Sequence, residues 1–349
     1  MTNPAVKTGI CSFGMSGKLF HAPFIQSHPG YELAAIVERT KQESGDKYPA
    51  AQVYPSVEEM LQDNSLQLII VNTPVQTHYD YVKKALDAGK MVVVEKPFTV
   101  TVEEAQKLEA YARDKNLLLT VYQNRRYDGD FFAIKEIINE GVLGELKEVE
   151  MRFDRFRPAF SGKTHKEGSI PGAGSLHDLG AHLIDQALQL FGWPEALFAD
   201  LRTLRKDVGA NDYFEILLYY PEIRVRLKST VIARESYYAY ILHGTNGTFL
   251  QQRSDMQEQE LLAGRMPTIE NWCPAPSSPD GLLHTGLNND IIRKETTSSP
   301  GNYMGFYEDL LHAIKYHSEN PVPASDGILI MKIIEAALHS NNEGKKIRL

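Results

Sequence analysis

The chain is poor in cysteine and has no long apolar run. Its 349 residues include two cysteines, Cys11 and Cys273, which excludes a disulfide framework, and no Cys-x-x-Cys pair is present to bind zinc. So little cysteine is typical of a reducing compartment, and we expect a cytoplasmic protein. No apolar run approaches the ~20 residues of a membrane-spanning helix, and the opening segment, residues 1–4, lacks the pattern of a signal peptide. We therefore expect no membrane partner.

Positive charge is also in short supply. The formal net charge is −8 at pH 7. A nucleic-acid-binding surface requires a basic stripe, so this balance argues against a nucleic-acid partner. The composition is otherwise that of an ordinary globular protein, and the chain is long enough for two domains. These properties predict an enzyme-sized protein whose partner is a small molecule.

The first third of the sequence alternates short apolar runs with helical patterns. The predicted strands are Val6–Cys11, Leu33–Val37, Leu68–Val71, Met91–Val94 and Leu117–Val121. The predicted helices are Lys18–Ser27, Val57–Gln62, Tyr79–Ala88 and Val102–Lys115, the last beginning with a capping box of Thr101 and Glu104. Near-continuous apolar strands separated by helices predict a doubly wound parallel sheet with helices on both faces. We expect this Rossmann-type α/β domain to comprise residues 1–123.

After residue 123 the strands become longer, and apolar and polar residues alternate along them. The predicted strands are Leu146–Phe156, Leu197–Leu204, Phe214–Tyr220, Val225–Val231 and Tyr238–Leu242, and the predicted helices are Phe131–Glu140, Phe306–Tyr316 and Asp326–Ser340. Two segments, Phe156–Ile170 and Met266–Ser299, are expected to be loops. Short connections predict an open, mostly antiparallel sheet in a second α/β domain, residues 124–349. Its outer face must be covered, so we expect a homodimer or homotetramer.

A glycine-rich turn follows the first predicted strand. The dinucleotide fingerprint is Gly-x-Gly-x-x-Gly at the start of a helix, whose N-terminus holds the pyrophosphate. The best register here runs from Ser12, in place of the first glycine, through Gly14, which lets the backbone approach a phosphate, to Gly17, which lets the helix pack on the strand. The predicted cofactor-binding turn is therefore Ser12, Phe13, Gly14, Met15, Ser16 and Gly17. Similar turns also occur in proteins that bind no nucleotide.

Residues after two further strands extend the predicted cofactor site. Glu38 stands about twenty residues past the turn, where a carboxylate accepts hydrogen bonds from the adenosine ribose, which favours NAD. Arg39 suits a 2′-phosphate, which favours NADP. The two residues leave the choice of NAD(P) open, with the balance toward NADP. Thr73, Pro74 and His78 follow Leu68–Val71 at the carboxyl edge of the sheet, where they would border the ribose or nicotinamide; His78 fits a surface position in a helix first turn equally well.

The segment Glu95-Lys96-Pro97 follows another predicted strand. A lysine at the carboxyl edge of the sheet would point into a cleft, where it could bind or polarise a substrate hydroxyl. Glu95 would line the cofactor site, or form an ion pair with Lys96. A surface charge is the alternative for this lysine.

A second set of polar residues lies on a predicted helix. Asp178 and His182 are four residues apart and share a face, with Asp185 close by. A histidine can remove a hydroxyl proton near neutral pH, and a carboxylate can orient its ring. The same residues could instead tie the helix to a loop or bind a metal ion, although no third ligand is obvious. Arg126 could reach a substrate, or form a salt bridge.

In combination, these motifs resemble the glucose–fructose oxidoreductase / inositol dehydrogenase / MocA family. The motifs occur with the family's order and spacing: Thr73-Pro74 with His78, Glu95-Lys96-Pro97, Arg125-Arg126-Tyr127, and Asp178 to Asp185. Phe20-His21-Ala22-Pro23 and Tyr122-Gln123-Asn124 are similar to a subgroup that includes scyllo-inositol dehydrogenases.

The resemblance implies a fold, an activity and a catalytic set. The fold is a Rossmann domain followed by an α/β domain whose open sheet mediates dimers or tetramers. The activity is NAD(P)-linked oxidation of a sugar, polyol or cyclitol hydroxyl, with Lys96, Asp178 and His182 as the catalytic set. These three and Arg126 would contact the substrate, without a metal. Two alternatives stay open: a dinucleotide-binding regulator on the same scaffold, and a metal-dependent lyase or isomerase. Ser12 departs from the family pattern, and this puts the cofactor affinity in question.

Overall fold

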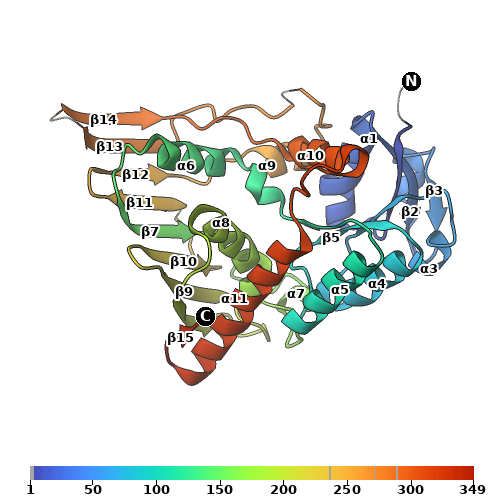
Figure 1. The fold of residues 1–349 in the computed structure, drawn as a ribbon, viewed down its shortest axis with the longest axis horizontal. Helices are drawn as coiled ribbons and strands as arrows, with labels where there is room; N and C mark the ends of the chain where they lie inside the picture. Colours follow the sequence, from blue (N-terminus) through green and yellow to red (C-terminus); the bar gives the residue numbers. More distant parts are fainter. Residues whose placement is uncertain (1–3, 236, 271, 288–289) are drawn as a thin grey trace. The chain divides into compact units, whose positions relative to one another are not determined.

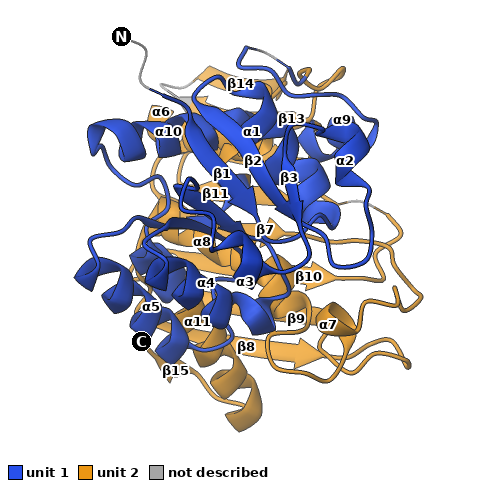
Figure 2. Ribbon diagram, turned by 90° about the vertical axis from the view of Figure 1, so that its right-hand side faces the viewer, with its two compact units in different colours: residues 1–124, 257–273, 302–328 blue, residues 125–256, 274–301, 329–349 orange. Residues whose placement is uncertain are grey.

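The computed structural model describes residues 4–235, 237–270, 272–287 and 290–349 (Figure 1). Residues 1–3 of the opening segment lie outside this part. The chain forms two compact units, each made of three stretches of sequence (Figure 2). Unit 1 comprises residues 1–124, 257–273 and 302–328, and unit 2 comprises residues 125–256, 274–301 and 329–349. The functional boundary between residues 123 and 124 stays a prediction. In addition, residues 257–273 and 302–328, which follow that boundary in the sequence, belong to unit 1.

A six-stranded parallel sheet forms the centre of unit 1. Its strands are β1 (Val6–Ile10), β2 (Tyr31–Val37), β3 (Gln52–Tyr54), β4 (Leu68–Val71), β5 (Met91–Glu95) and β6 (Leu119–Tyr122). The order β3-β2-β1-β4-β5-β6 is that of dinucleotide-binding folds, with its topological switch point between β1 and β4. All residues of β4 and β6 are buried, as a sheet covered on both faces requires. The predicted doubly wound sheet is confirmed; the short strand β3 was not predicted.

Nine helices and helical turns of unit 1 lie in the part of the chain that the structure describes. They are the π-helix η1 (Gly17–His21), α1 (Ala22–Ser27), α2 (Ser44–Lys47), α3 (Val57–Met60), the 3₁₀-helix η2 (Val75–Thr77), α4 (His78–Asp87), α5 (Val102–Asp114), α9 (Gln257–Leu262) and α10 (Tyr303–Tyr316). The predicted capping box of Thr101 and Glu104 starts α5. Helix α4 packs on β4 and β5 and against α5, while α1 packs on β2 and against α10.

A nine-stranded sheet forms the centre of unit 2. Its strands are β7 (Leu146–Arg152), β8 (Ala196–Arg202), β9 (Tyr213–Tyr219), β10 (Arg224–Thr230), β11 (Tyr240–Gly244), β12 (Gly247–Gln251), β13 (Gly281–Leu287), β14 (Asp290–Thr296) and β15 (Ile347–Arg348). The order is β14-β13-β12-β11-β7-β10-β9-β8-β15. Among the described pairings of this second sheet, β7 and β10 pair in parallel and all other neighbours pair antiparallel. The predicted open, mostly antiparallel sheet is confirmed.

Helices cover one side of this sheet (Figure 1). They are α6 (Gly129–Glu140), the π-helix η4 (Leu176–Gly180), α8 (Ala181–Phe191) and most of α11 (Ala324–Glu343), with the short α7 (Thr164–Glu167) in a connection and the 3₁₀-helix η3 (Asn124–Tyr127) at the start. Alternate residues of β9 are buried, among them Phe214, Ile216 and Leu218, and α8 packs on β10. Among the described residues, the helices are too short or too polar to span a bilayer.

The prediction that Met266–Ser299 is one long loop is wrong. The segment contains the hairpin of β13 and β14, although residues 271, 288 and 289 lie outside the described part. Its sequence, rich in proline and serine, has no clear apolar alternation, and β13 is a strand because it pairs with β12 over Gly281–Thr285. Tertiary pairing of this kind overrides a weak local propensity. The other predicted loop, Phe156–Ile170, is irregular except for α7.

Candidate functional site

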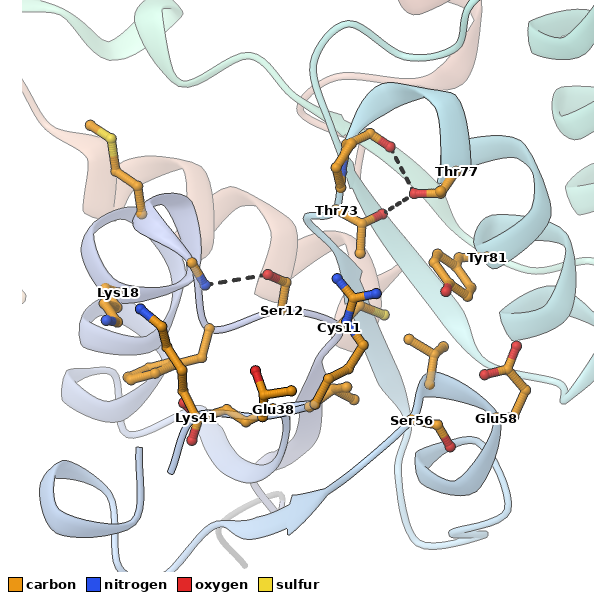
Figure 3. Close-up of a pocket in the computed structure, with 18 residues that line it drawn as sticks. Cys11, Ser12, Lys18, Glu38, Lys41, Ser56, Glu58, Thr73, Thr77 and Tyr81 are labelled. Carbon is orange, nitrogen blue, oxygen red and sulfur yellow. Dashed lines mark hydrogen bonds between the residues drawn. The ribbon is translucent and has the colours of Figure 1, made fainter. Parts of the chain in front are cut away.

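A groove of about 820 Å³ opens at the carboxyl ends of β1, β2 and β4 in unit 1 (Figure 3). This is the topological switch point, where doubly wound folds bind ligands. Eight predicted cofactor residues line it: Ser12, Phe13, Gly14, Met15, Glu38, Arg39, Thr73 and Pro74. Figure 3 shows Lys18, Lys41 and Glu38 on one side of the groove and Thr73, Thr77 and Tyr81 on the other. The groove therefore gathers residues from three separate strand ends.

The glycine-rich turn has the geometry that a pyrophosphate requires. A methyl group added at Gly14 would meet only the Ser12 hydroxyl, at 3.5 Å, so the backbone is open to a close ligand. A methyl group at Gly17 would lie 2.2 Å from the Ser12 carbonyl oxygen, so this position accepts only glycine. Ser12 closes the turn, because its hydroxyl accepts a hydrogen bond of 3.3 Å from the Gly14 amide. The turn thus fits a dinucleotide although Ser12 replaces the first glycine.

Glu38 does not present a vacant carboxylate to the groove. Its oxygens accept hydrogen bonds from the amides of Glu43 (3.1 Å) and Ser44 (2.9 Å) and from the Ser44 hydroxyl. These donors belong to the start of α2, which was absent from the predicted elements. The prediction that Glu38 binds a ribose was therefore made without knowledge of these hydrogen bonds from Glu43 and Ser44.

Basic side chains surround the same end of the groove. Arg39, Lys18 and Lys41 all line it, and Arg39 is exposed. Lys18 forms an ion pair with Glu43, and the Lys41 ammonium lies 3.4 Å from the same carboxylate. Hydrogen bonds from these two lysines lower the pKa of Glu43. This end of the groove is therefore suited to an anion.

His78 lies behind the groove instead of on its wall. It begins α4, as the sequence indicated, but its side chain is 1% exposed. Nδ1 faces the carbonyl oxygens of Pro97 (3.0 Å) and Phe98 (3.2 Å), and Nε2 faces that of Thr73 (2.9 Å). Burial lowers the pKa of His78. The ring ties the loop after β4 to the turn after β5, and contact with a cofactor remains a prediction that this geometry does not favour.

Glu95 and Ser16 also lie outside the lining of the groove. The Glu95 side chain is 13% exposed; Oε1 lies 3.1 Å from His21 Nε2, and Oε2 accepts a hydrogen bond of 3.1 Å from the Lys96 amide. The Ser16 hydroxyl also bonds to this carboxylate. Burial alone would raise the pKa of Glu95, but the hydrogen bond from His21, the charges of His21 and Lys96 and the bond from Ser16 lower it. The group is therefore a carboxylate, and its nearest cationic partner is His21.

His21 was not predicted to have a function; its only sequence signal is the Phe20-His21-Ala22-Pro23 motif. The ring is fully buried, with Nδ1 2.8 Å from the Tyr307 hydroxyl. That hydroxyl also contacts the Phe20 carbonyl oxygen at 2.6 Å. Nε2 donates to the Glu95 carboxylate, which can only accept. His21 and Glu95 thus make a buried salt-bridge contact.

In unit 2, Asp178 and His182 lie across the junction of two helices. Asp178 is in the π-helix η4, and His182, which is 5% exposed, is in the first turn of α8. π-Helical turns are rare and frequent at functional sites. The ammonium of Lys166, from α7, lies 3.0 Å from Asp178 Oδ1. No signal in the sequence connects Lys166 to Asp178, because α7 and η4 are separate segments of the chain.

Arg126 and Asp185 are partners in unit 2. The Arg126 guanidinium donates three hydrogen bonds of 2.6–3.2 Å to the Asp185 carboxylate, and the two side chains are 12% and 3% exposed. This two-pronged pair lies within unit 2, so it is not the salt bridge between domains that is the alternative to a substrate contact, and it occupies Asp185, a carboxylate of the metal alternative. No group of three metal-ligating side chains occurs among the residues that the structure describes. Nearby, burial lowers the pKa of His177 to about 4.

Comparison with known proteins adds independent evidence. Residues 6–123 match the family model described as "Oxidoreductase family, NAD-binding Rossmann fold", and residues 135–349 match its C-terminal alpha/beta domain. The uncharacterised oxidoreductase YdgJ of Escherichia coli is 38% identical, over 96% of both chains. The scyllo-inositol 2-dehydrogenase (NADP(+)) IolW of Bacillus subtilis is 35% identical over 99% of this chain and 96% of its own.

A solved structure agrees with both. A Bacteroides fragilis protein with 42% identity has a TM-score of 0.90 and covers 99% of this chain and 100% of its own. The chain thus belongs to the oxidoreductase family named after glucose–fructose oxidoreductase, inositol dehydrogenase and MocA, and carries both of that family's domains.

Proposed function

We propose that this oxidoreductase prefers NADP and acts on a secondary hydroxyl of a sugar, polyol or cyclitol, or on the matching ketone. The observation that carries the proposal is the groove at the switch point, with a glycine turn open at Gly14 and an anion-suited end. The name of the Bacillus subtilis relative, an NADP-linked scyllo-inositol dehydrogenase, supports both the substrate class and the cofactor.

The preference for NADP is inferred from the state of Glu38. An acidic residue at this position selects NAD by accepting hydrogen bonds from the ribose 2′-hydroxyl. Here both carboxylate oxygens already accept hydrogen bonds from the start of α2. The exposed Arg39 guanidinium beside it offers a fork of donors that matches a phosphate. We infer that Arg39 holds the 2′-phosphate, because Lys18 and Lys41 are already paired with Glu43.

The proposed catalytic set is Lys96, Asp178 and His182. When bound, the nicotinamide supplies the acceptor or donor of hydride. His182 removes the hydroxyl proton in oxidation and returns it in reduction. Lys96 donates a hydrogen bond to the same oxygen and stabilises the negative charge that develops there. Asp178 orients His182, and the ion pair with Lys166 holds the Asp178 carboxylate in place.

A substrate panel tests the proposal. Purified protein is mixed with NADP⁺ or NAD⁺ and with scyllo-inositol, myo-inositol, D-glucose or sorbitol, and the absorbance of the reduced cofactor is followed. We expect reduction with at least one of these alcohols, faster with NADP⁺ at equal concentration. NADP⁺ binding by calorimetry without turnover on the whole panel, in either direction, would support the regulator instead. Loss of activity to a chelator would support the metal-dependent alternative.

We also propose that the chain is cytoplasmic and forms a homodimer or homotetramer. The scarcity of cysteine supports a reducing compartment. The edge strand β14 supports self-association, because Ile291 is 79% exposed and Ile292 is 42% exposed. An exposed edge strand with large apolar side chains is normally covered by another chain or element. A second copy is the occupant that the resemblance to oligomeric family members favours.

A further inference from the structure

A buried network of His21, Glu95 and Tyr307 lies behind the turn that carries Lys96. We propose that His21 and Tyr307 are positioning residues for Lys96, acting through the Glu95 carboxylate. The inference rests on the proposed role of Lys96 in hydride transfer. It concerns residues of unit 1 alone, so every contact in the argument belongs to one compact unit.

The Glu95 carboxylate joins three segments of unit 1. It receives a hydrogen bond from His21 in η1, one from Ser16 in the glycine turn, and one from the backbone amide of Lys96. The orientation of the Lys96 backbone therefore depends on where this carboxylate is held. Of the three donors, His21 alone is a fully buried ring, so we expect it to contribute most to the position of Glu95.

Tyr307 in turn holds His21. Its hydroxyl is hydrogen-bonded to His21 Nδ1 at 2.8 Å and contacts the Phe20 carbonyl oxygen, which the Tyr122 hydroxyl also contacts at 3.1 Å. The His21 ring also packs on Tyr122, with centroids 4.5 Å apart. Because all polar atoms of this chain of bonds have partners, the ring has one orientation available to it.

A second imidazole braces the turn from its other end. His78 contacts the carbonyl oxygens of Pro97 and Phe98, immediately after Lys96. The backbone of Lys96 is thus held before it by Glu95 and after it by His78. Bracing on both sides is what a reacting group requires, since a displacement of 1 Å can lower turnover by about 10²-fold.

Stability alone is a poor explanation for the ion pair of His21 and Glu95. Replacing a buried ion pair by apolar side chains of similar volume is often neutral or stabilising, because removing two charges from water is costly. The surroundings are apolar and aromatic, with Phe24, Tyr122 and Phe306 buried nearby. An ion pair in such a place gives a specific orientation to its neighbours.

The principal test is a double-mutant cycle on turnover. We expect His21→Leu to lower kcat about 10- to 100-fold, with the Kd for NADP⁺ changed less than about twofold. The substrate is the panel compound with the fastest wild-type turnover. In a Lys96→Met background the same substitution should have almost no further effect, because its effect passes through Lys96. His28→Leu is the matched control: His28 is a buried histidine of unit 1 whose Nδ1 accepts a hydrogen bond from the Gly30 amide, two residues away.

Two further variants keep the proposal testable if His21→Leu does not fold. Tyr307→Phe removes a single oxygen, and we expect it to lower kcat by about threefold to tenfold. In His21→Gln the amide can still donate to Glu95, so its kcat should lie between those of wild type and His21→Leu.

The outcomes separate the two proposals. If Lys96→Met keeps wild-type turnover, the proposed function and the positioning role both fail. If Lys96→Met loses turnover while Tyr307→Phe and a folded His21→Leu keep it, only the positioning role fails. Equal losses from His21→Leu with and without Lys96 would show a general structural effect and overturn the positioning role.

Discussion

Several side chains at the candidate site already have hydrogen-bond partners, which limits the contacts that they can make with a ligand. Glu38 is occupied by the start of α2, Arg126 by Asp185, and His78 by three backbone carbonyl oxygens. Arg39 remains exposed at the groove. At this scale, cofactor choice depends on which groups are already engaged and which can still reach a ligand.

Arg39→Ala tests the origin of the cofactor preference. A charged hydrogen bond is worth about 1.5–3 kcal/mol, so we expect the Kd for NADP⁺ to rise by roughly tenfold or more. The Kd for NAD⁺ should change little, because NAD⁺ has no 2′-phosphate. Lys47→Ala is the control: Lys47 is an exposed cation on α2 that does not line the groove. Calorimetric titration of NAD⁺ and of NADP⁺ into each variant gives a Kd for each cofactor with Arg39→Ala and with Lys47→Ala. If Arg39→Ala raised the Kd values for NAD⁺ and NADP⁺ equally, the assignment would be contradicted.

Lys96→Met and His182→Ala test the proposed reacting groups. General acid–base catalysis contributes about 10²–10⁴ in rate, so each substitution should lower kcat by that order. The Kd for NADP⁺ should stay within about twofold, because neither side chain lines the groove. Steady-state kinetics and calorimetry on the same preparations provide both values. Wild-type turnover in both variants would refute the catalytic set.

At the scale of elements, the glycine turn and the helix after it form one structural piece. Gly17→Ala would place a methyl group 2.2 Å from a backbone oxygen of Ser12, which no side-chain rotation relieves. We expect a loss of about 1–3 kcal/mol in the free energy of unfolding and weakened NADP⁺ binding. Denaturant unfolding measures the first effect and calorimetry the second.

Gly45→Ala is the control for this prediction. A methyl group at Gly45, in α2, would have no neighbouring heavy atom within 4 Å. Its effect on unfolding should therefore be neutral or stabilising, by about 0.4–1 kcal/mol. Equal destabilisation by Gly17→Ala and Gly45→Ala would mean that the close contact at Ser12 is not what requires a glycine.

The same scale shows which elements local sequence predicts. α5 was predicted because its capping box and apolar spacing lie within one segment. The short strand β3 and the hairpin of β13 and β14 were missed, because each is a strand through pairing with a distant partner. The π-helices η1 and η4 interrupt α-helical patterns that continue through them in the sequence, so periodicity alone predicted ordinary helices.

For the whole molecule, the exposed edge strand β14 predicts self-association. Light scattering should give twice or four times the chain mass. Ile291→Lys should shift the particle toward the monomer, because a charge in a covered apolar contact is costly to bury. Leu262→Lys is the control, since Leu262 is 62% exposed on α9. A wild-type monomer would contradict the prediction, and a mass unaffected by Ile291→Lys would place the interface elsewhere.

The sequence by itself determined the strands of the Rossmann sheet other than β3, the glycine turn and the family, because periodicity, capping and turn chemistry act over a few neighbouring residues. It also named the residues of the candidate groove that follow strand ends, since parallel strands bring their carboxyl ends to one edge. Only the tertiary structure decided which of those polar groups are engaged. The partners of Glu95, His78 and Asp185 come from segments 19 to 74 residues away or from other elements, and no local pattern encodes such pairings.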